Sequence, residues 1–64
     1  NNIAKTVKRL REKAGLSQEK LARLADVSNN TLINIEAGKQ DNPTIDTLSK
    51  IAKALDTRVD ELIK

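Results

Sequence analysis

The chain contains 64 residues with a formal net charge of +3, and it has no Cys, His, Met or aromatic residue. At this length we expect one domain, residues 1–64, which hides only about 60% of the surface that its unfolded form exposes. The absent residue types exclude disulfide scaffolds, zinc sites and thiol or histidine chemistry, so we expect no enzyme, metal or cofactor. With no membrane-length apolar run and no signal-peptide pattern, the sequence predicts a cytoplasmic protein.

The basic charge is concentrated at the start of the chain. Residues 1–20 carry six Lys or Arg and two acidic residues. A basic N-terminal segment suits a polyanionic partner, but a solvated helix surface has the same composition.

The first predicted helix covers about residues 2–14. Its apolar residues fall within one narrow stripe at about 100° per residue, and they are Ile3, Val7, Leu10 and Ala14.

Two short helices follow, over about residues 18–25 and 29–36. Ser17 and Ser28 are placed to cap them, because a hydroxyl can accept from a free N–H of the first turn. Asp26 breaks the first of the two.

A fourth helix, over about residues 45–55, is capped by Thr44. Val59, Leu62 and Ile63 indicate a short fifth helix, and they either complete the core or lie at a two-fold interface. No segment alternates with period two, so the sequence predicts a compact all-α domain of five helices.

Two short helices joined by a turn at about residues 26–28 describe a helix-turn-helix, although an ordinary helical corner has the same outline. On the helix at 29–36, Leu32 and Ile35 mark the buried direction. Asn30 and Asn34 lie on the opposite side, and Asn29 lies at its edge.

Asn disfavours a helix by about 0.5 kcal/mol relative to Ala, so three of them in this helix require another explanation. An Asn side chain can bind N6 and N7 of adenine in the major groove. Asn29, Asn30 and Asn34 are therefore predicted to read A·T-containing DNA, the alternative being that Asn29 and Asn30 are turn or capping residues. Ile33, at an outward angle, either contacts a thymine methyl or packs against a neighbouring helix.

Phosphate contacts are expected at helix N-termini, which present free N–H groups. Ser17 and Gln18 begin one such helix, while Asn42 and Thr44 precede another. Lys39 could hold a further phosphate or be a solvated loop residue.

Arg11 and Glu36 each lie at the edge of an apolar stripe, which allows a partly buried ion pair between them.

Five short motifs, in this order and spacing, resemble the phage-repressor/Cro helix-turn-helix family, also called the XRE family. They are Leu-Ser-Gln-Glu-Lys-Leu-Ala (16–22), Asp-Val-Ser (26–28), Ile-Glu-Ala-Gly-Lys (35–39), Asn-Pro-Thr (42–44) and Ala-Leu (54–55). The resemblance covers about residues 3–63. It implies a five-helix lambda-repressor-like fold whose second and third helices read DNA, usually as a dimer on a palindromic operator.

Carried over by position, the resemblance implies roles for several residues. Those roles are phosphate or groove-edge contacts at Gln18, Ser28 and Lys39, base contacts at Asn29, Asn30 and Asn34, an ion pair between Arg11 and Glu36, and close helix approach at Ala22. Two positions depart from the family pattern. Asp26 replaces the usual turn Gly, which predicts a mildly strained left-handed residue, and Ala37 removes one possible phosphate contact.

The resulting hypothesis is a sequence-specific regulator, a repressor, that binds double-stranded DNA as a homodimer. The alternative is an antitoxin-type module that shares the fold and binds a protein such as a toxin. The polar, uncharged outward side of the helix at 29–36 favours DNA, because a protein-binding surface is enriched in aromatics or Arg.

Overall fold

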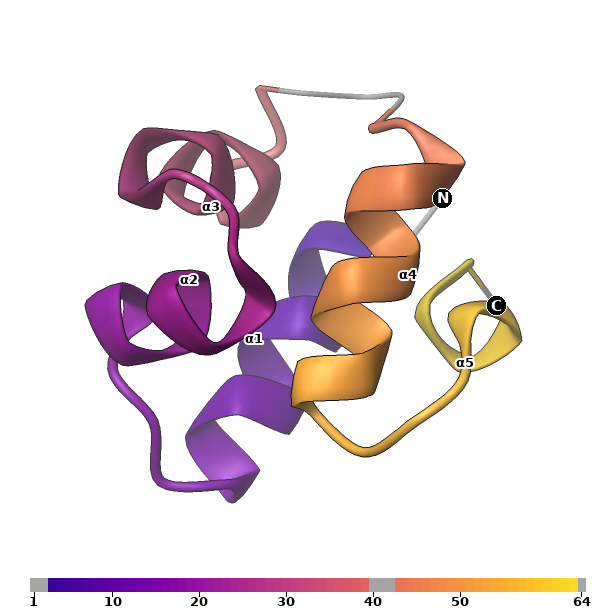
Figure 1. The fold of residues 1–64 in the computed structure, drawn as a ribbon, viewed down its shortest axis with the longest axis horizontal. Helices are drawn as coiled ribbons and strands as arrows, with labels where there is room; N and C mark the ends of the chain where they lie inside the picture. Colours follow the sequence, from indigo (N-terminus) through magenta and orange to yellow (C-terminus); the bar gives the residue numbers. More distant parts are fainter. Residues whose placement is uncertain (1–2, 40–42, 64) are drawn as a thin grey trace.

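The computed structural model describes residues 3–39 and 43–63, which form five helices without a strand (Figure 1). The helices are α1 (Ile3–Lys13), α2 (Gln18–Ala25), α3 (Asn29–Glu36), α4 (Ile45–Ala54) and α5 (Val59–Ile63). The predicted all-α class is confirmed, with α1 and α4 ending one residue earlier than expected. None of the described helices is long and apolar enough to cross a membrane.

Hydroxyl caps begin three of the helices, as predicted. Ser17 Oγ accepts from the N–H of Lys20 at 3.0 Å, and Ser28 Oγ accepts from the N–H of Thr31 at 3.0 Å. Thr44 Oγ1 accepts from the N–H of Thr47, the third residue of α4, at 3.1 Å. Each cap satisfies one of the N–H groups that a helix leaves unpaired in its first turn.

The core is entirely aliphatic and draws on all five helices. Figure 1 shows α2 and α3 side by side, with the N-terminal part of α1 passing behind α4. Helix α1 contacts α3 and α5, and α4 contacts α2 and α5. The buried apolar residues are Ile3, Val7, Leu21, Ala22, Ala25, Leu32, Ile35, Leu48, Ile51, Ala52 and Leu62.

The structure corrects the predicted stripe of the first helix at one position. Ala14 is exposed, because the helix ends at Lys13 and Ala14 lies beyond its regular spacing. The buried side of α1 instead includes Thr6, whose exposed fraction is 9%.

The sequence left open whether the apolar residues of the last helix complete the core or lie at a two-fold interface, and the answer differs from residue to residue. Leu62 is fully buried and completes the core, whereas Ile63 is 48% exposed. Val59 is half-buried and also packs against the core, so of these three residues it is Ile63 that keeps a large exposed apolar surface.

Two leucines of α2 provide a matched test of the core. Leu21 has no exposed surface and Leu24 is 54% exposed. We expect Leu21→Ala to lower the free energy of unfolding by about 2–5 kcal/mol, because it removes buried apolar atoms and leaves a cavity. Leu24→Ala is expected to change it by about 0.5 kcal/mol or less. Urea unfolding followed by far-ultraviolet circular dichroism measures both, and equal losses would contradict this core.

Candidate nucleic-acid interface

The corner between α2 and α3 has the geometry that a helix-turn-helix requires. Asp26 follows α2 in the left-handed region, with φ 57° and ψ 44°, as its position in the turn predicted. The next N–H, that of Val27, donates to the carbonyl of Ala22 at 3.0 Å and closes the helix end. Ser28 then caps α3, so only residues 26–28 separate the two helices.

Two aliphatic side chains of helix α3 pack it onto the core. Leu32 is fully buried and Ile35 is 1% exposed. Asn30 points almost directly away from them at about 100° per residue, which agrees with its exposure. Asn34 lies on the flank of the outward side, at about 130° from the buried direction, and is half-buried.

The outward side of α3 carries unbonded amide groups. Within residues 3–39 and 43–63, the side chains of Asn29, Asn30 and Asn34 form no hydrogen bond to the protein. Ile33 is 39% exposed on the opposite flank from Asn34. This surface therefore combines amide donors and acceptors with one apolar side chain, exposed at Asn29, Asn30 and Ile33 and half-buried at Asn34.

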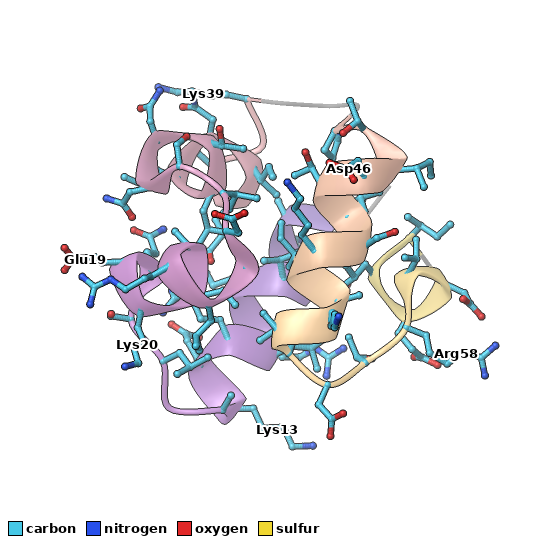
Figure 2. All side chains as sticks on the ribbon, viewed as in Figure 1. Lys13, Glu19, Lys20, Lys39, Asp46 and Arg58 are labelled. Carbon is cyan, nitrogen blue, oxygen red and sulfur yellow. The ribbon has the colours of Figure 1, made fainter. Side chains whose placement is uncertain are left out.

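Donor groups surround α3 at its two ends. At the N-terminus of α2, Ser17 caps only the N–H of Lys20, so the N–H groups of Gln18 and Glu19 face outward without a partner inside the helix. Lys39 is exposed just beyond α3, and Figure 2 shows its side chain extending away from the core.

Two other residues predicted to contact the DNA backbone, Ser28 and Thr44, are exposed helix caps. Ser28 Oγ lies 2.7 Å from Thr31 Oγ1, and Thr44 Oγ1 donates to Thr47 Oγ1 at 3.0 Å. Asn42, the remaining predicted contact, lies outside the described residues. The described residues contain no group of acidic, Cys or His side chains that could hold a metal ion.

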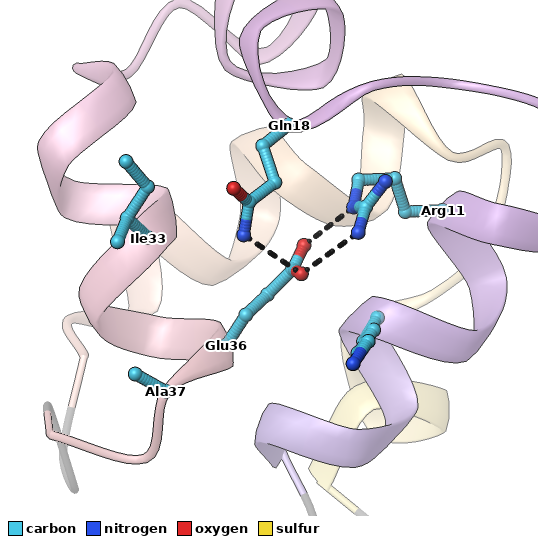
Figure 3. Close-up of a pocket in the computed structure, with 6 residues that line it drawn as sticks. Arg11, Gln18, Ile33, Glu36 and Ala37 are labelled. Atoms are coloured by element: carbon cyan, nitrogen blue, oxygen red, sulfur yellow. Dashed lines mark hydrogen bonds and ion pairs between the residues drawn. The ribbon is translucent and has the colours of Figure 1, made fainter.

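Arg11 and Glu36 are brought together across the first and third helices (Figure 3). Arg11 Nε lies 2.7 Å from Glu36 Oε2, and Arg11 Nη2 donates to Glu36 Oε1 at 3.1 Å. The two side chains are only 11% and 3% exposed. Hydrogen bonding to Glu36, reinforced by its charge and opposed by burial, raises the pKa of Arg11 above its usual value. Arg11 Nη1 also donates to the carbonyl of Leu16 at 2.6 Å, which fixes the loop before α2.

Gln18 adds a contact that the sequence did not indicate. Its Nε2 donates to Glu36 Oε1 at 3.1 Å, next to Arg11 in Figure 3. The resemblance assigned Gln18 to phosphate, and no pattern in the sequence connects positions 18 residues apart. An open hollow of about 330 Å³ lies beside this bond, and it is lined by Lys8, Arg11, Gln18, Ile33, Glu36 and Ala37.

The ion pair generates a prediction about stability. Arg11→Met leaves the carboxylate of Glu36 buried without its cationic partner, so we expect the free energy of unfolding to fall by about 3 kcal/mol or more. Arg23→Met is the control, because Arg23 pairs with Glu19 at 3.7 Å and both side chains are more than 70% exposed. That surface pair is expected to contribute about 0–1 kcal/mol. Thermal unfolding of the two variants checks this, and similar melting temperatures would refute a structural role for Arg11.

A sequence model of the helix-turn-helix family (HTH_3) matches residues 7–62. The chain is similar to the HTH-type transcriptional regulator SinR of Bacillus subtilis (strain 168), with 36% identity over 61 residues that cover 95% of this chain and 55% of SinR. It therefore spans about half the length of this relative. An HTH-type transcriptional regulator of Archaeoglobus fulgidus is 34% identical over 56 residues, which cover 88% of this chain and 79% of that protein.

Solved structures share the fold closely. The crystal structure of SinR in complex with DNA superposes with a TM-score of 0.94 at 35% identity, over 97% of this chain and 98% of that chain. The restriction-modification controller protein C.AhdI from Aeromonas hydrophila gives a TM-score of 0.90 at 33% identity, over 95% and 91% of the two chains.

Proposed function

Because the chain belongs to the helix-turn-helix family of XRE type, we propose that it represses transcription by binding a double-stranded DNA operator. The family consists of DNA-binding transcriptional regulators rather than enzymes. The observation that carries the proposal is the outward side of α3, where three Asn amides are unbonded above the buried Leu32 and Ile35. We place this activity in the cytoplasm.

In the proposed complex, α3 enters the major groove, which is wide enough to admit a helix. The residues at the N-terminal end of such a helix reach the base edges, so Asn29 and Asn30 are the first readers. Asn34 lies one turn further along the same helix and reads the next position. Ile33 contacts a thymine methyl from the other flank.

The phosphate contacts fix the register of α3 and carry no sequence information. Ser17 and the free N–H groups of Gln18 and Glu19 hold one phosphate at the start of α2, where the helix dipole favours an anion. We propose further contacts to the DNA backbone from Lys39, Ser28 and Thr44, and from Asn42, which lies outside the described residues. The similarity to SinR, whose structure was solved in complex with DNA, supports double-stranded DNA as the partner.

We propose that two copies bind a palindromic operator, one on each half-site. Half-sites of this kind lie about one helical turn of DNA apart, so a symmetric dimer matches a two-fold sequence. The exposed Ile63 of α5 is the apolar side chain we assign to the contact between the copies. A selection of bound sequences from a random duplex library tests the proposal. A two-fold consensus is expected, and the absence of any consensus would refute sequence-specific binding.

The role of Asn34 is tested on the operator recovered by that selection. We expect Asn34→Ala to weaken operator binding by about 1–3 kcal/mol, because one paired contact to a base is lost. Binding to random duplex DNA is expected to stay nearly unchanged. Ser49→Ala, an exposed polar change on α4, serves as the control. Equal losses on operator and random DNA would show that Asn34 does not read a base.

The role of Lys39 is tested through the salt dependence of binding. A phosphate contact releases about one counterion, so Lys39→Ala should reduce the slope of log K against log salt by about one on every duplex. Lys13→Ala removes the same charge at the opposite end of the molecule in Figure 2 and should leave the slope unchanged. A change in base preference with Lys39→Ala would instead identify Lys39 as a base reader.

A further inference from the structure

We propose that Gln18 is a positioning residue for the helix that reads the bases. Its side-chain amide, by donating to Glu36 at 3.1 Å, holds the last turn of α3 against the first residue of α2. This inference rests on the proposed function, because it assigns the selectivity of α3 in part to a residue that reads no base.

The carboxylate of Glu36 is the fixed point of this arrangement. Its side chain is 3% exposed, so its oxygens must find their donors within the protein. Oε2 accepts from Arg11 Nε, and Oε1 accepts from both Arg11 Nη2 and Gln18 Nε2. The last residue of α3 is thus bound from two sides, by α1 through Arg11 and by α2 through Gln18.

The two donors differ in what their removal would do. Arg11 engages both oxygens of Glu36 and supplies the compensating charge, so the fold keeps its ion pair when the amide of Gln18 is removed. Gln18 adds the hydrogen bond that joins this carboxylate to α2, and a hydrogen bond constrains angle as well as distance. Without it, the carboxylate of Glu36 keeps its bonds to Arg11 of α1.

The hollow beside Glu36 is lined by Gln18 as well as by residues of α3, so no protein atoms fill the space next to this bond. It has a volume of about 330 Å³ and is lined on the α3 side by Ile33 and Ala37. Asn34 precedes Glu36 by only two residues, so a shift in the last turn moves the Asn34 amide as well. A contact to adenine through two hydrogen bonds tolerates about 0.5 Å of displacement. Of the three proposed base-reading residues, Asn34 is therefore the most sensitive to loss of the bond from Gln18 to Glu36.

A direct phosphate contact by the Gln18 side chain is the competing explanation. An amide group has two N–H donors, and Glu36 occupies one of them. Because Gln is uncharged, neither role changes the salt slope. A phosphate contact acts equally on all sequences, whereas a positioning role acts only where bases are read. Selectivity therefore separates the two explanations.

The test uses Gln18→Met, which keeps the side-chain length and removes the donor. Dissociation constants are measured on the selected operator, on random duplex DNA, and on the operator changed at the base pair where Asn34→Ala loses discrimination. We expect about a tenfold loss on the operator, a change of less than about twofold on random DNA, and a reduced preference for the original base pair. Lys20→Met, at an exposed side chain that points outward in Figure 2, should affect the three duplexes equally.

A second measurement excludes a general loss of structure. Gln18→Met combined with Asn34→Ala should bind the operator about as well as Asn34→Ala alone, because the contact that Gln18 positions is already missing. Additive losses would overturn the positioning role, as would equal losses on operator and random DNA. If the unmodified protein does not distinguish its operator from random DNA, the proposed function itself fails. If it does and Gln18→Met discriminates equally well, only the role of Gln18 fails.

Discussion

The carboxylate of Glu36 is buried where the first three helices meet, and it joins the end of α3 to α1 and α2 through three hydrogen bonds. The aliphatic contacts of Leu32 and Ile35 hold α3 onto the core, but apolar contact has no direction of its own. A charged hydrogen bond does have direction, and the guanidinium of Arg11 meets the carboxylate through two nitrogens. The same guanidinium binds the carbonyl of Leu16, so one cation sets both the loop before α2 and the end of α3.

Unpaired helix N-termini explain how a chain of net charge +3 can present a surface suited to a polyanion. Each hydroxyl cap, at Ser17, Ser28 and Thr44, satisfies a single N–H and leaves its neighbours in the first turn without a helical partner. These N–H groups carry the positive end of the helix dipole at a fixed place. Such donors need no long flexible side chain, so little side-chain entropy is lost when they bind.

Local patterns predicted the elements well, because caps and apolar spacing act over a few residues. The Ser and Thr caps gave the starts of α2, α3 and α4, and helical spacing separated Leu32 and Ile35 from the Asn face. Contacts set by tertiary structure were harder to predict. The bond from Gln18 to Glu36 depends on how two helices pack, and spacing alone placed Ala14 in a stripe that the helix does not continue. The half-burial of Asn34 likewise depends on its neighbours, which the helical angle does not include.

Three alanines are buried on the two helices that pack on each other, α2 and α4. Ala22, Ala25 and Ala52 have exposed fractions of 2%, 3% and 2%. A β-branched side chain at any of them would have to fit into a filled core, at about 1–3 kcal/mol. A domain of this size has only about 3–5 kcal/mol of stability from its core, so such a change would leave it folded in the cold and unfolded on modest warming. These three positions are therefore where a conditional, heat-inactivated form of the protein could be made without altering any residue of the proposed DNA-facing surface.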